Sequence, residues 1–494
     1  MKARHFTTTL IVIIMLLSAM SALGSTARTA MSRIVVISDT HLLSPDLVTA
    51  GSAIDKADAG DSKMMKMSDD IMSAITDSII GLDPQVVLIT GDLTYNGERA
   101  SHERMAHYLE RMAQHGIRPL VIPGNHDCNN PYAKRFDGDH TAPAATVTRD
   151  EFARIYRNYG YGKGVKRDPA SLSYCCEPID GIVIIGIDSN MDENNTLTCR
   201  GDQTDTYYNG GRVKPETLQW VTEQARKACS KGKRVIAMMH HHLVPHFDQE
   251  ERFLANYIVS DHNNIARQLM QAGIHTLFTG HLHVTDAATL YYNEERTDSI
   301  VEIATGSAIC YPFAMRVAQL RSSHHLAIDT RWVNATASCP TLRQQGRQRI
   351  IDAAPALASI ISGKAWNRLE GHIGQIKAML ENGGGQVNMP ESPQQATQLA
   401  LRHLKEVLSR TLLAVVEGNE RQQDVESIIN QGKQGTKAMI QEVVPSQADA
   451  LWEFFQNDVY PRLDPLVRSV LEDRNAVGTP TESHTDDLQL DLIL

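Results

Sequence analysis

Short β-branched runs alternate with amphipathic stretches as far as about residue 330, and this alternation limits the possible folds more than any other feature. The apolar runs are about four to seven residues long and are flanked by Gly, Pro or Asp, which favours buried strands. They are Arg33–Ser38, Val86–Thr90, Pro119–Ile122, Ile182–Asp188, Arg234–His240, Thr276–Thr279 and Ile300–Thr305. Helical periodicity appears between several of them, at Met64–Ile80, Glu98–His115, Pro215–Ser230 and Asp261–Ala272. The pattern predicts an α/β layered domain with much parallel sheet over residues 32–335.

The pattern changes after Cys339, where long amphipathic stretches are separated by glycine and proline. They predict a helical C-terminal domain at 341–474, which we interpret as structural support for the first domain. The expected helices are Gln344–Ile361, Trp366–Asn382, Gln395–Val416, Asp424–Val443 and Ala450–Asp473. Residues 475–494 are polar and acidic, and they predict a flexible tail.

The N-terminus resembles an export signal. Lys2 and Arg4 precede the apolar run Leu10–Leu17, and Ala22-Leu23-Gly24 offers small residues for cleavage. The run is too short to span a bilayer comfortably, although an uncleaved anchor remains an alternative. We therefore expect a signal peptide at 1–24, a periplasmic or extracellular protein, and no stable membrane span after cleavage.

Charge and cysteine content exclude two classes of protein. The formal net charge is −10, which argues against a nucleic-acid-binding surface. The seven cysteines are odd in number and show no CxxC spacing, so neither a zinc knuckle nor a disulfide scaffold is indicated. A small phosphate substrate remains compatible with the acidic chain, because a metal pair would determine the local field.

Polar motifs follow five of the predicted strands. They are Asp39-Thr40-His41, Gly91-Asp92, Gly124-Asn125-His126-Asp127, His240-His241-His242 and Gly280-His281-Leu282-His283. Ligands of α/β sheets gather outside the carboxyl ends of the strands, so these side chains should share one rim. Buried carboxylates without a partner are costly, and the cluster therefore predicts a metal site.

The order DxH, GD, GNHD, H and GHxH resembles the calcineurin-like metallophosphoesterase superfamily, over Arg33 to the Thr330 region. It closely resembles the branch that contains class III cyclic-nucleotide phosphodiesterases and glycerophosphodiesterases. The resemblance implies a four-layer αββα sandwich with two divalent metals at one sheet edge, followed here by the helical region. Histidine, asparagine and aspartate suit Mn, Fe, Zn or Co, so the identity of the metals stays open.

The resemblance also implies a role for each motif residue. One metal is held by Asp39, His41 and His283, and the other by Asn125, His240 and His281. Asp92 bridges both metals. His126 is not a ligand; it faces the substrate, where it can protonate the leaving oxygen. Asp127 accompanies that histidine, and a loop-capping role for it is equally compatible with the pattern.

Three neighbours of the motifs leave alternatives open. His241 competes with His240 as the ligand, although strand alternation favours His240. Tyr95 occupies the position of a tyrosinate ligand in purple acid phosphatases, but His41 would fill that coordination position, so we expect Tyr95 in the wall of the site. Cys128 offers a thiolate, yet a small buried residue is the simpler interpretation.

We expect a phosphodiesterase for small phosphoesters, in which a hydroxide bridging the two metals attacks phosphorus in line. A phosphomonoesterase or nucleotidase with the same site is the main alternative, and a non-catalytic metal-binding or scaffold protein is a third. The oligomeric state stays open. Substrate contacts are expected from rim loops that carry Asn96, Arg200, Arg212, Tyr311 and Arg316.

Overall fold

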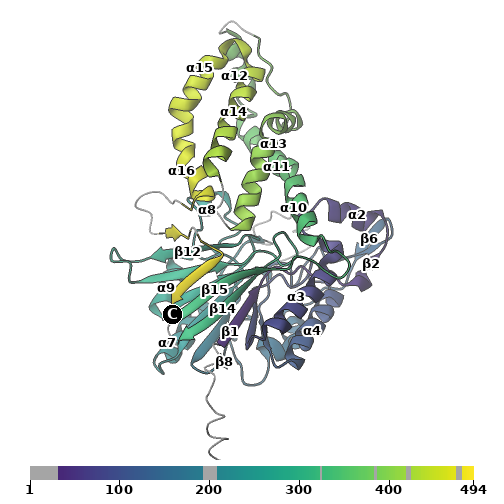
Figure 1. Cartoon of the computed structure of the whole chain (residues 1–494), viewed down its shortest axis with the longest axis vertical. Helices are drawn as coiled ribbons and strands as arrows, with labels where there is room; N and C mark the ends of the chain where they lie inside the picture. The colour runs from purple at the N-terminus through teal and green to yellow at the C-terminus, as the bar shows by residue number, and fades with distance from the viewer. Residues whose placement is uncertain are drawn as a thin grey trace, which may run out of the picture.

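The computed structural model describes residues 32–192, 209–322, 325–382, 386–418, 424–473, 481–484 and 486–494. The expected signal peptide at 1–24 and Arg200 lie outside these residues. Figure 1 shows a strand-rich body from which a group of helices projects at one end. Among the described residues, no helix has the length and apolar character needed to cross a membrane.

The first sheet has the strand order β17-β15-β14-β1-β3-β4. Its strands are β1 (Ser32–Ile37), β3 (Val86–Ile89), β4 (Arg118–Val121), β14 (Ala314–Ser322), β15 (His325–Trp332) and β17 (Gln489–Ile493). The strands β1, β3 and β4 run parallel, whereas β14 pairs antiparallel with β1. The carboxyl ends of β1, β3 and β4 therefore lie at the same edge.

The second sheet has the order β16-β12-β13-β11-β10-β9-β8-β7. Its strands are β7 (Lys166–Arg167), β8 (Tyr174–Ile179), β9 (Ile182–Ile187), β10 (Arg234–Met239), β11 (Ile274–Thr279), β12 (Asp286–Tyr291), β13 (Ser299–Ala304) and β16 (Thr481–Ser483). The central strands β9, β10, β11 and β13 are parallel to one another. All seven strands expected from the sequence are present, with ends shifted by no more than two residues.

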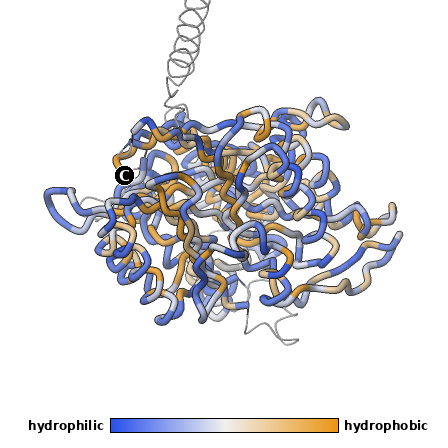
Figure 2. Tube along the Cα trace, turned by 90° about the horizontal axis from the view of Figure 1, so that it is seen from below, coloured by the Kyte–Doolittle hydropathy of each residue, from blue (hydrophilic) through white to orange (hydrophobic). Residues whose placement is uncertain are grey.

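Helices cover the outer faces of the two sheets (Figure 1). They are α3 (Ser68–Leu82) and α4 (Arg99–Gln114) beside the first sheet, and α7 (Pro215–Cys229) and α9 (His262–Gln271) beside the second. Successive residues of β9 face opposite ways, as a strand requires. Ile184 joins the large core that holds β1 and β3, whereas Ile185 packs in a second core with Val221 of α7. The four-layer αββα fold is confirmed, and Figure 2 shows hydrophobic stretches gathered inside the sandwich.

The predicted flexible tail at 475–494 is wrong for most of its described residues. Thr481–Ser483 pairs antiparallel with β12, and Gln489–Ile493 pairs antiparallel with β15. Leu490 and Leu492 point into the core, while their neighbours are exposed. The alternation of leucine with polar residues is a strand pattern, which the acidic composition concealed.

The helical region contains α10 (Leu342–Asp352), α11 (Ala354–Leu369), α12 (Ile373–Asn382), α13 (Pro393–Glu417), α14 (Val425–Val443), α15 (Ala448–Phe454) and α16 (Tyr460–Leu471). Leu342, Ile350 and Leu413 of this region belong to the main core of the sandwich. The expected helix Gln344–Ile361 is divided at Ala353, which caps α10 and precedes α11. The base of the helical region is thus packed on the sandwich.

Short elements complete the described fold. A small sheet joins β2 (Val48–Thr49), β5 (Lys134–Asp137) and β6 (His140–Pro143), and the short helices are α2 (Ser52–Ala59), α5 (Arg149–Ile155) and α8 (Glu250–Phe253). The segment after α2 leads back toward the edge where the polar motifs meet.

Candidate metal centre

The first group of donors surrounds Asp39, directly after β1. Asp39 Oδ1 lies 3.2 Å from His283 Nε2 and 3.8 Å from His41 Nε2. The two histidine nitrogens are 3.0 Å apart. Asp39 Oδ2 instead accepts hydrogen bonds from Ser38 Oγ and from the His281 backbone N–H. Asp39 Oδ1 is buried and has no hydrogen-bond partner among the described residues. This oxygen is therefore available to bind a metal ion together with His41 and His283.

The second group of donors surrounds His240, directly after β10. His240 Nδ1 donates to the Thr90 carbonyl at 2.9 Å, because a carbonyl can only accept. His240 Nε2 therefore turns a lone pair toward Asn125 Oδ1, only 3.0 Å away. Two acceptors at this distance need a cation or a proton between them. The His281 ring lies 4.7 Å from the His240 ring and directs Nε2 to the Asn256 carbonyl at 3.2 Å.

Asp92 lies between the two groups. Its Oδ2 is 3.5 Å from His41 Nε2 and also 3.5 Å from His240 Nε2. Its Oδ1 is held by the His126 backbone N–H at 2.8 Å. A carboxylate oxygen placed equally between the groups occupies a bridging position.

The donor set fits two divalent ions. The distances between neighbouring donor atoms are 3.0–3.8 Å. Ligands about 2.0–2.2 Å from one metal lie roughly 3–3.5 Å from each other, which agrees with this spacing. Asp39 and Asp92 are almost fully buried, so their charge requires compensation.

The electrostatics of the cage side chains lead to the same conclusion. Burial lowers the pKa of His240, but Asp92 and Asp39, with the hydrogen bond to Thr90, together raise it to about 9. Burial also lowers the pKa of His283, and Asp39 raises it to about 10. The carboxylates thus recruit protons onto the histidines when no other cation is near. Metal binding displaces such protons, so protons and metals compete for this cage.

Backbone strain is concentrated in the same place. Five of the predicted ligands have positive φ angles, between 35° and 69°. They are Asp39, His41, Asp92, His281 and His283. Non-glycine residues in this region cost of order 1–3 kcal/mol each, and such strain gathers at functional sites. The strand ends are therefore bent to aim donors at one volume.

Glycines allow the loops to approach closely, which gives a first prediction. A Cβ at Gly280 would lie 1.9 Å from Ser38 Oγ and 2.4 Å from Asp39 Oδ2. Gly280→Ala should displace Asp39, lower bound metal and destabilise the fold by about 1–3 kcal/mol. Gly81→Ala in α3 is the matched control, since nothing lies within 4 Å of its added Cβ. Metal analysis and thermal unfolding measure both effects; equal behaviour of the two variants would contradict this prediction.

His126 and Asp127 have different environments. His126 Nδ1 faces the Tyr95 carbonyl at 2.7 Å, which directs Nε2 toward Asp92 Oδ2 at 3.9 Å. The His126 side chain is 17% exposed, so it reaches the mouth of the cage. Asp127 is fully buried and accepts hydrogen bonds from the backbone N–H groups of Leu93, Thr94 and Gly124. Asp127 thus joins two loops of the site, which supports its loop-capping interpretation.

The structure helps to decide whether His241, Tyr95 or Cys128 could be a metal ligand. Both ring nitrogens of His241 already face protein groups, Ser189 Oγ at 2.8 Å and the Asn209 carbonyl at 3.1 Å. Tyr95 packs beside Phe136 in a small apolar cluster, and burial followed by Asp61 raises its phenol pKa. Burial and then Asp192 likewise raise the pKa of the Cys128 thiol. These contacts favour His240 over its neighbour and a wall position for the tyrosine.

Sequence reasoning misjudged Arg316 and missed Lys63. Arg316 lies on β14, is fully buried and donates to the carbonyls of Ala304 and Asp286, so it is a structural residue rather than a rim residue. The Lys63 ammonium lies 3.6 Å from Asp61. Burial lowers the pKa of His41 and His126 most, and the charge of Lys63 lowers both further. A loop lysine without a motif gives no sequence signal of this placement.

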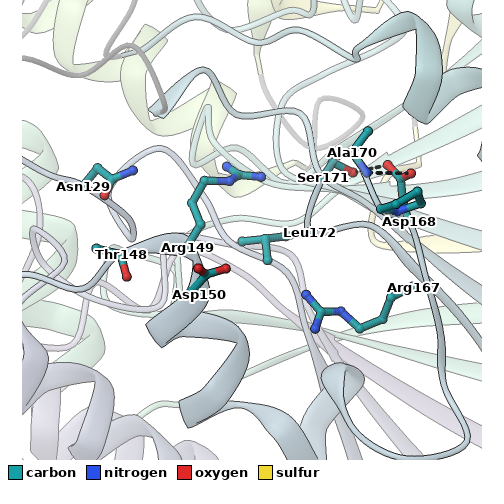
Figure 3. Close-up of a pocket in the computed structure, with 10 residues that line it drawn as sticks. Asn129, Thr148, Arg149, Asp150, Arg167, Asp168, Ala170, Ser171 and Leu172 are labelled. Carbon is teal, nitrogen blue, oxygen red and sulfur yellow. Dashed lines mark hydrogen bonds between the residues drawn. The ribbon is translucent and has the colours of Figure 1, made fainter.

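A cavity of about 610 Å³ opens beside α5 (Figure 3). None of the seven predicted ligands is among its lining residues. Arg149 forms ion pairs with Asp188 and Asp192. Asp168 accepts hydrogen bonds from Ala170 and Ser171 (Figure 3). The Arg149 guanidinium is thus already paired within the protein, and we assign no substrate to this cavity.

Oxygen and imidazole donors at the carboxyl ends of parallel strands in an αββα sandwich form a candidate centre for metal ions. The family model for calcineurin-like phosphoesterases matches residues 32–285, and the chain belongs to this family. The expected family is thus confirmed, and the chain is a hydrolase that acts on phosphoesters.

Individual relatives are more distant. A cAMP/cGMP dual specificity phosphodiesterase from Mycobacterium tuberculosis is 23% identical over 283 residues, which are 57% of this chain and 69% of that protein. A dimetal phosphatase from Danio rerio is 12% identical, with a TM-score of 0.42, and the match covers 61% of this chain and 96% of that one. A purple acid phosphatase from yellow lupin is 11% identical, with a TM-score of 0.37, over 61% and 51% of the respective chains.

Proposed function

We propose that the protein is a phosphodiesterase whose cage holds two divalent metal ions. The carrying observation is Asp92 Oδ2, which is 3.5 Å from a histidine of each donor group. Asp39, His41 and His283 would hold one ion, and Asn125, His240 and His281 the other, with Asp92 shared. The similarity to a cyclic-nucleotide phosphodiesterase supports a diester rather than a monoester substrate.

The metal pair supplies positive charge that lowers the pKa of a water molecule and neutralises the phosphate. Attack forms one P–O bond to the water oxygen and breaks the P–O bond to the leaving alcohol. The leaving oxygen needs a proton, and His126 Nε2 points into the cage to deliver it. Because Nδ1 already donates to the Tyr95 carbonyl, His126 can give a proton from Nε2 only as the imidazolium.

Substrate class is tested with matched aryl substrates. We expect the metal-loaded protein to hydrolyse bis(p-nitrophenyl) phosphate with a higher kcat/KM than p-nitrophenyl phosphate. A diester rate no better than the monoester rate would favour the phosphomonoesterase alternative. Bound metal without turnover on either substrate, with Mn, Zn, Fe and Co each tried, would favour a non-catalytic protein.

Lys63 is suited to contact the substrate phosphate. Its side chain is 16% exposed, and its charge acts on Asp92, His41 and His126, which supports a place for the ammonium near the mouth of the cage. Arg349 of α10 fixes this segment by donating to the Lys63 carbonyl at 2.9 Å and pairing with Asp58 at 2.6 Å. The helical region, for which we retain 341–474, would thus support the rim of the site as well as the sandwich.

Lys63→Met should raise KM for the diester by about tenfold, a loss of about 1.4 kcal/mol in binding free energy, while metal content is unchanged.

The same substitution should also shift the pH dependence of kcat/KM. Lys63 lowers the pKa of His126, so removing its charge should raise that pKa and move the alkaline limb of kcat/KM to higher pH. Lys56→Met in α2, which carries an exposed lysine, is the control. An unchanged KM and pH profile would remove Lys63 from the site.

We further propose that residues 1–24 direct export to the periplasm or outside the cell. The basic start and apolar run support this proposal. The six described cysteines are free thiols, so the described fold does not depend on a disulfide. N-terminal sequencing of protein recovered from the exported fraction should find residues 1–24 removed; recovery of the intact chain in the cytosol would contradict export.

A further inference from the structure

A second cluster of buried histidines and carboxylates lies deeper in the second sheet. It consists of His242 and His246 on the loop after β10, Glu250 of α8, Asp286 of β12 and Glu302 of β13. The two histidines, Glu250 and Glu302 are at most 1% exposed. The predicted dinuclear cage uses none of these five side chains.

In each histidine of this cluster, Nδ1 faces a carboxylate oxygen. His242 Nδ1 lies 3.0 Å from Glu250 Oε1, and His246 Nδ1 lies 3.3 Å from Asp286 Oδ1. Histidines that bind metals commonly give their other ring N–H to a carboxylate, which fixes the tautomer and orients the ring. The hydrogen bond to Glu250 leaves Nε2 of His242 as its donor atom. Asp286 lies near Nδ1 of His246 without a hydrogen bond, and we assign Nε2 of His246, which faces Glu302, as its donor atom.

Nε2 of both rings is buried without a hydrogen-bond partner among the described residues. His246 Nε2 is 3.3 Å from Glu302 Oε1, and the two rings are 4.5 Å apart between centroids. Ligands about 2.0–2.1 Å from a tetrahedral zinc are roughly 3.3 Å apart, which matches the distance between His246 Nε2 and Glu302 Oε1, and all three ligand atoms lie within 4.8 Å of one another. Two unpartnered imidazole nitrogens and Glu302 Oε1, which also accepts from Thr279 Oγ, therefore lie close together.

Glu302 is fixed as an anion in this cluster. Its Oε2 accepts from the backbone N–H groups of Leu243 and Val244, at 2.7 and 2.6 Å, and its Oε1 accepts from Thr279 Oγ at 2.6 Å. With Glu250 and Asp286, three carboxylates surround two imidazoles. If both imidazoles are neutral, the cluster carries a charge of −3. Glu250 and Glu302 are fully buried and Asp286 is 21% exposed, so this charge favours a bound cation or a proton on an imidazole.

We propose that His242, His246 and Glu302 bind a third metal ion, a divalent transition metal of the zinc type. His242 Nε2, His246 Nε2 and Glu302 Oε1 are the ligands, and Glu250 and Asp286 orient the two histidines. This donor set of two imidazoles and one carboxylate suits zinc. The site does not depend on the proposed phosphodiesterase activity, because it shares no ligand with the dinuclear cage.

The third ion would act on structure. The loop that it ties down begins at His240, a predicted ligand of the dinuclear cage, and runs to Glu250. Ser483 of β16 holds the His246 carbonyl from the other side, and Glu302 holds the start of the loop. An ion at this point would fix the position of His240 relative to β11 and β13.

Metal analysis of the full chain, produced with zinc in the medium, tests the third site. We expect three metal ions per chain in the wild type and two in His246→Asn. Asp92→Asn should retain the ion at this cluster, and His115→Asn, at an exposed histidine after α4, should keep all three. A metal content that His246→Asn leaves unchanged would overturn the proposal.

If His246→Asn does not fold, crystals of the wild-type protein can still test the third metal site. Anomalous diffraction at the zinc edge should show a peak about 2.0–2.1 Å from the three ligand atoms. Peaks at the dinuclear cage alone would exclude the third ion and leave the proposed function intact. A peak at this cluster in a protein without phosphoester hydrolysis would support the third ion and remove the proposed function.

Discussion

Asp92→Asn should abolish phosphoester hydrolysis and reduce bound metal in one step. The substitution preserves size but removes the negative charge from the only side chain placed between both donor groups, counted over the described residues. An amide oxygen is a poorer bridge than a carboxylate, and two cations would then share one remaining carboxylate, Asp39. We expect kcat/KM to fall to the level of the uncatalysed background.

A matched control separates this effect from general damage. Asp180→Asn changes the same chemistry in an exposed turn between β8 and β9 and should leave metal and activity unchanged. Circular dichroism should show that Asp92→Asn is folded, because its backbone contacts persist. Full activity in Asp92→Asn would contradict the bridging role, and full activity with only one bound metal would contradict the metal pair itself.

His126→Ala should lower kcat by about 10²–10⁴-fold while both metals remain bound. The reason is the position of its imidazole, which reaches the mouth of the cage but faces the Tyr95 carbonyl through Nδ1. A proton donor is needed most when the leaving alcohol is a poor leaving group. The loss should therefore be large for an alkyl ester and smaller for a p-nitrophenyl ester.

The pH profile gives a readout that a structural role of His126 would not change. Only the imidazolium can protonate the leaving oxygen, so kcat/KM should fall with rising pH above the His126 pKa. Burial, followed by the charge of Lys63, lowers that pKa, although Asp92 raises it. His126→Ala should lose this alkaline limb. Loss of metal in His126→Ala would instead identify His126 as a ligand, and equal losses for both ester types would contradict proton transfer.

Much of the fold and the candidate cage could be predicted because each motif directly follows an apolar strand. Asp39, Asp92 and Asn125 occupy ends of parallel strands, and parallel strands necessarily bring such ends to one edge. The choice between His240 and His241 needed the structure, since the Thr90 carbonyl that orients one ring is 150 residues away. The alternation of residues along the strand also favoured His240, but it could not exclude His241 as the ligand.

Other features depend on contacts between distant segments. The edge strand β17 has only two inward leucines, Leu490 and Leu492, within an acidic segment, so its strand character was weak. Lys63 reaches the cage because Arg349, far along the chain, holds its loop. The second cluster of buried histidines and carboxylates brings His246, on the loop after β10, to Glu302 of β13, and no local spacing in the sequence predicts this pairing.

X-ray absorption at the metal edge tests the central claim most directly, because it measures whether two ions are held close together. The protein would be loaded with cobalt, alongside Asp92→Asn and His246→Asn. We predict metal–metal scattering at about 3.5–4 Å in the wild type and in His246→Asn, and its loss in Asp92→Asn. A fully loaded wild type that contains only isolated ions would contradict the metal pair and the function that depends on it.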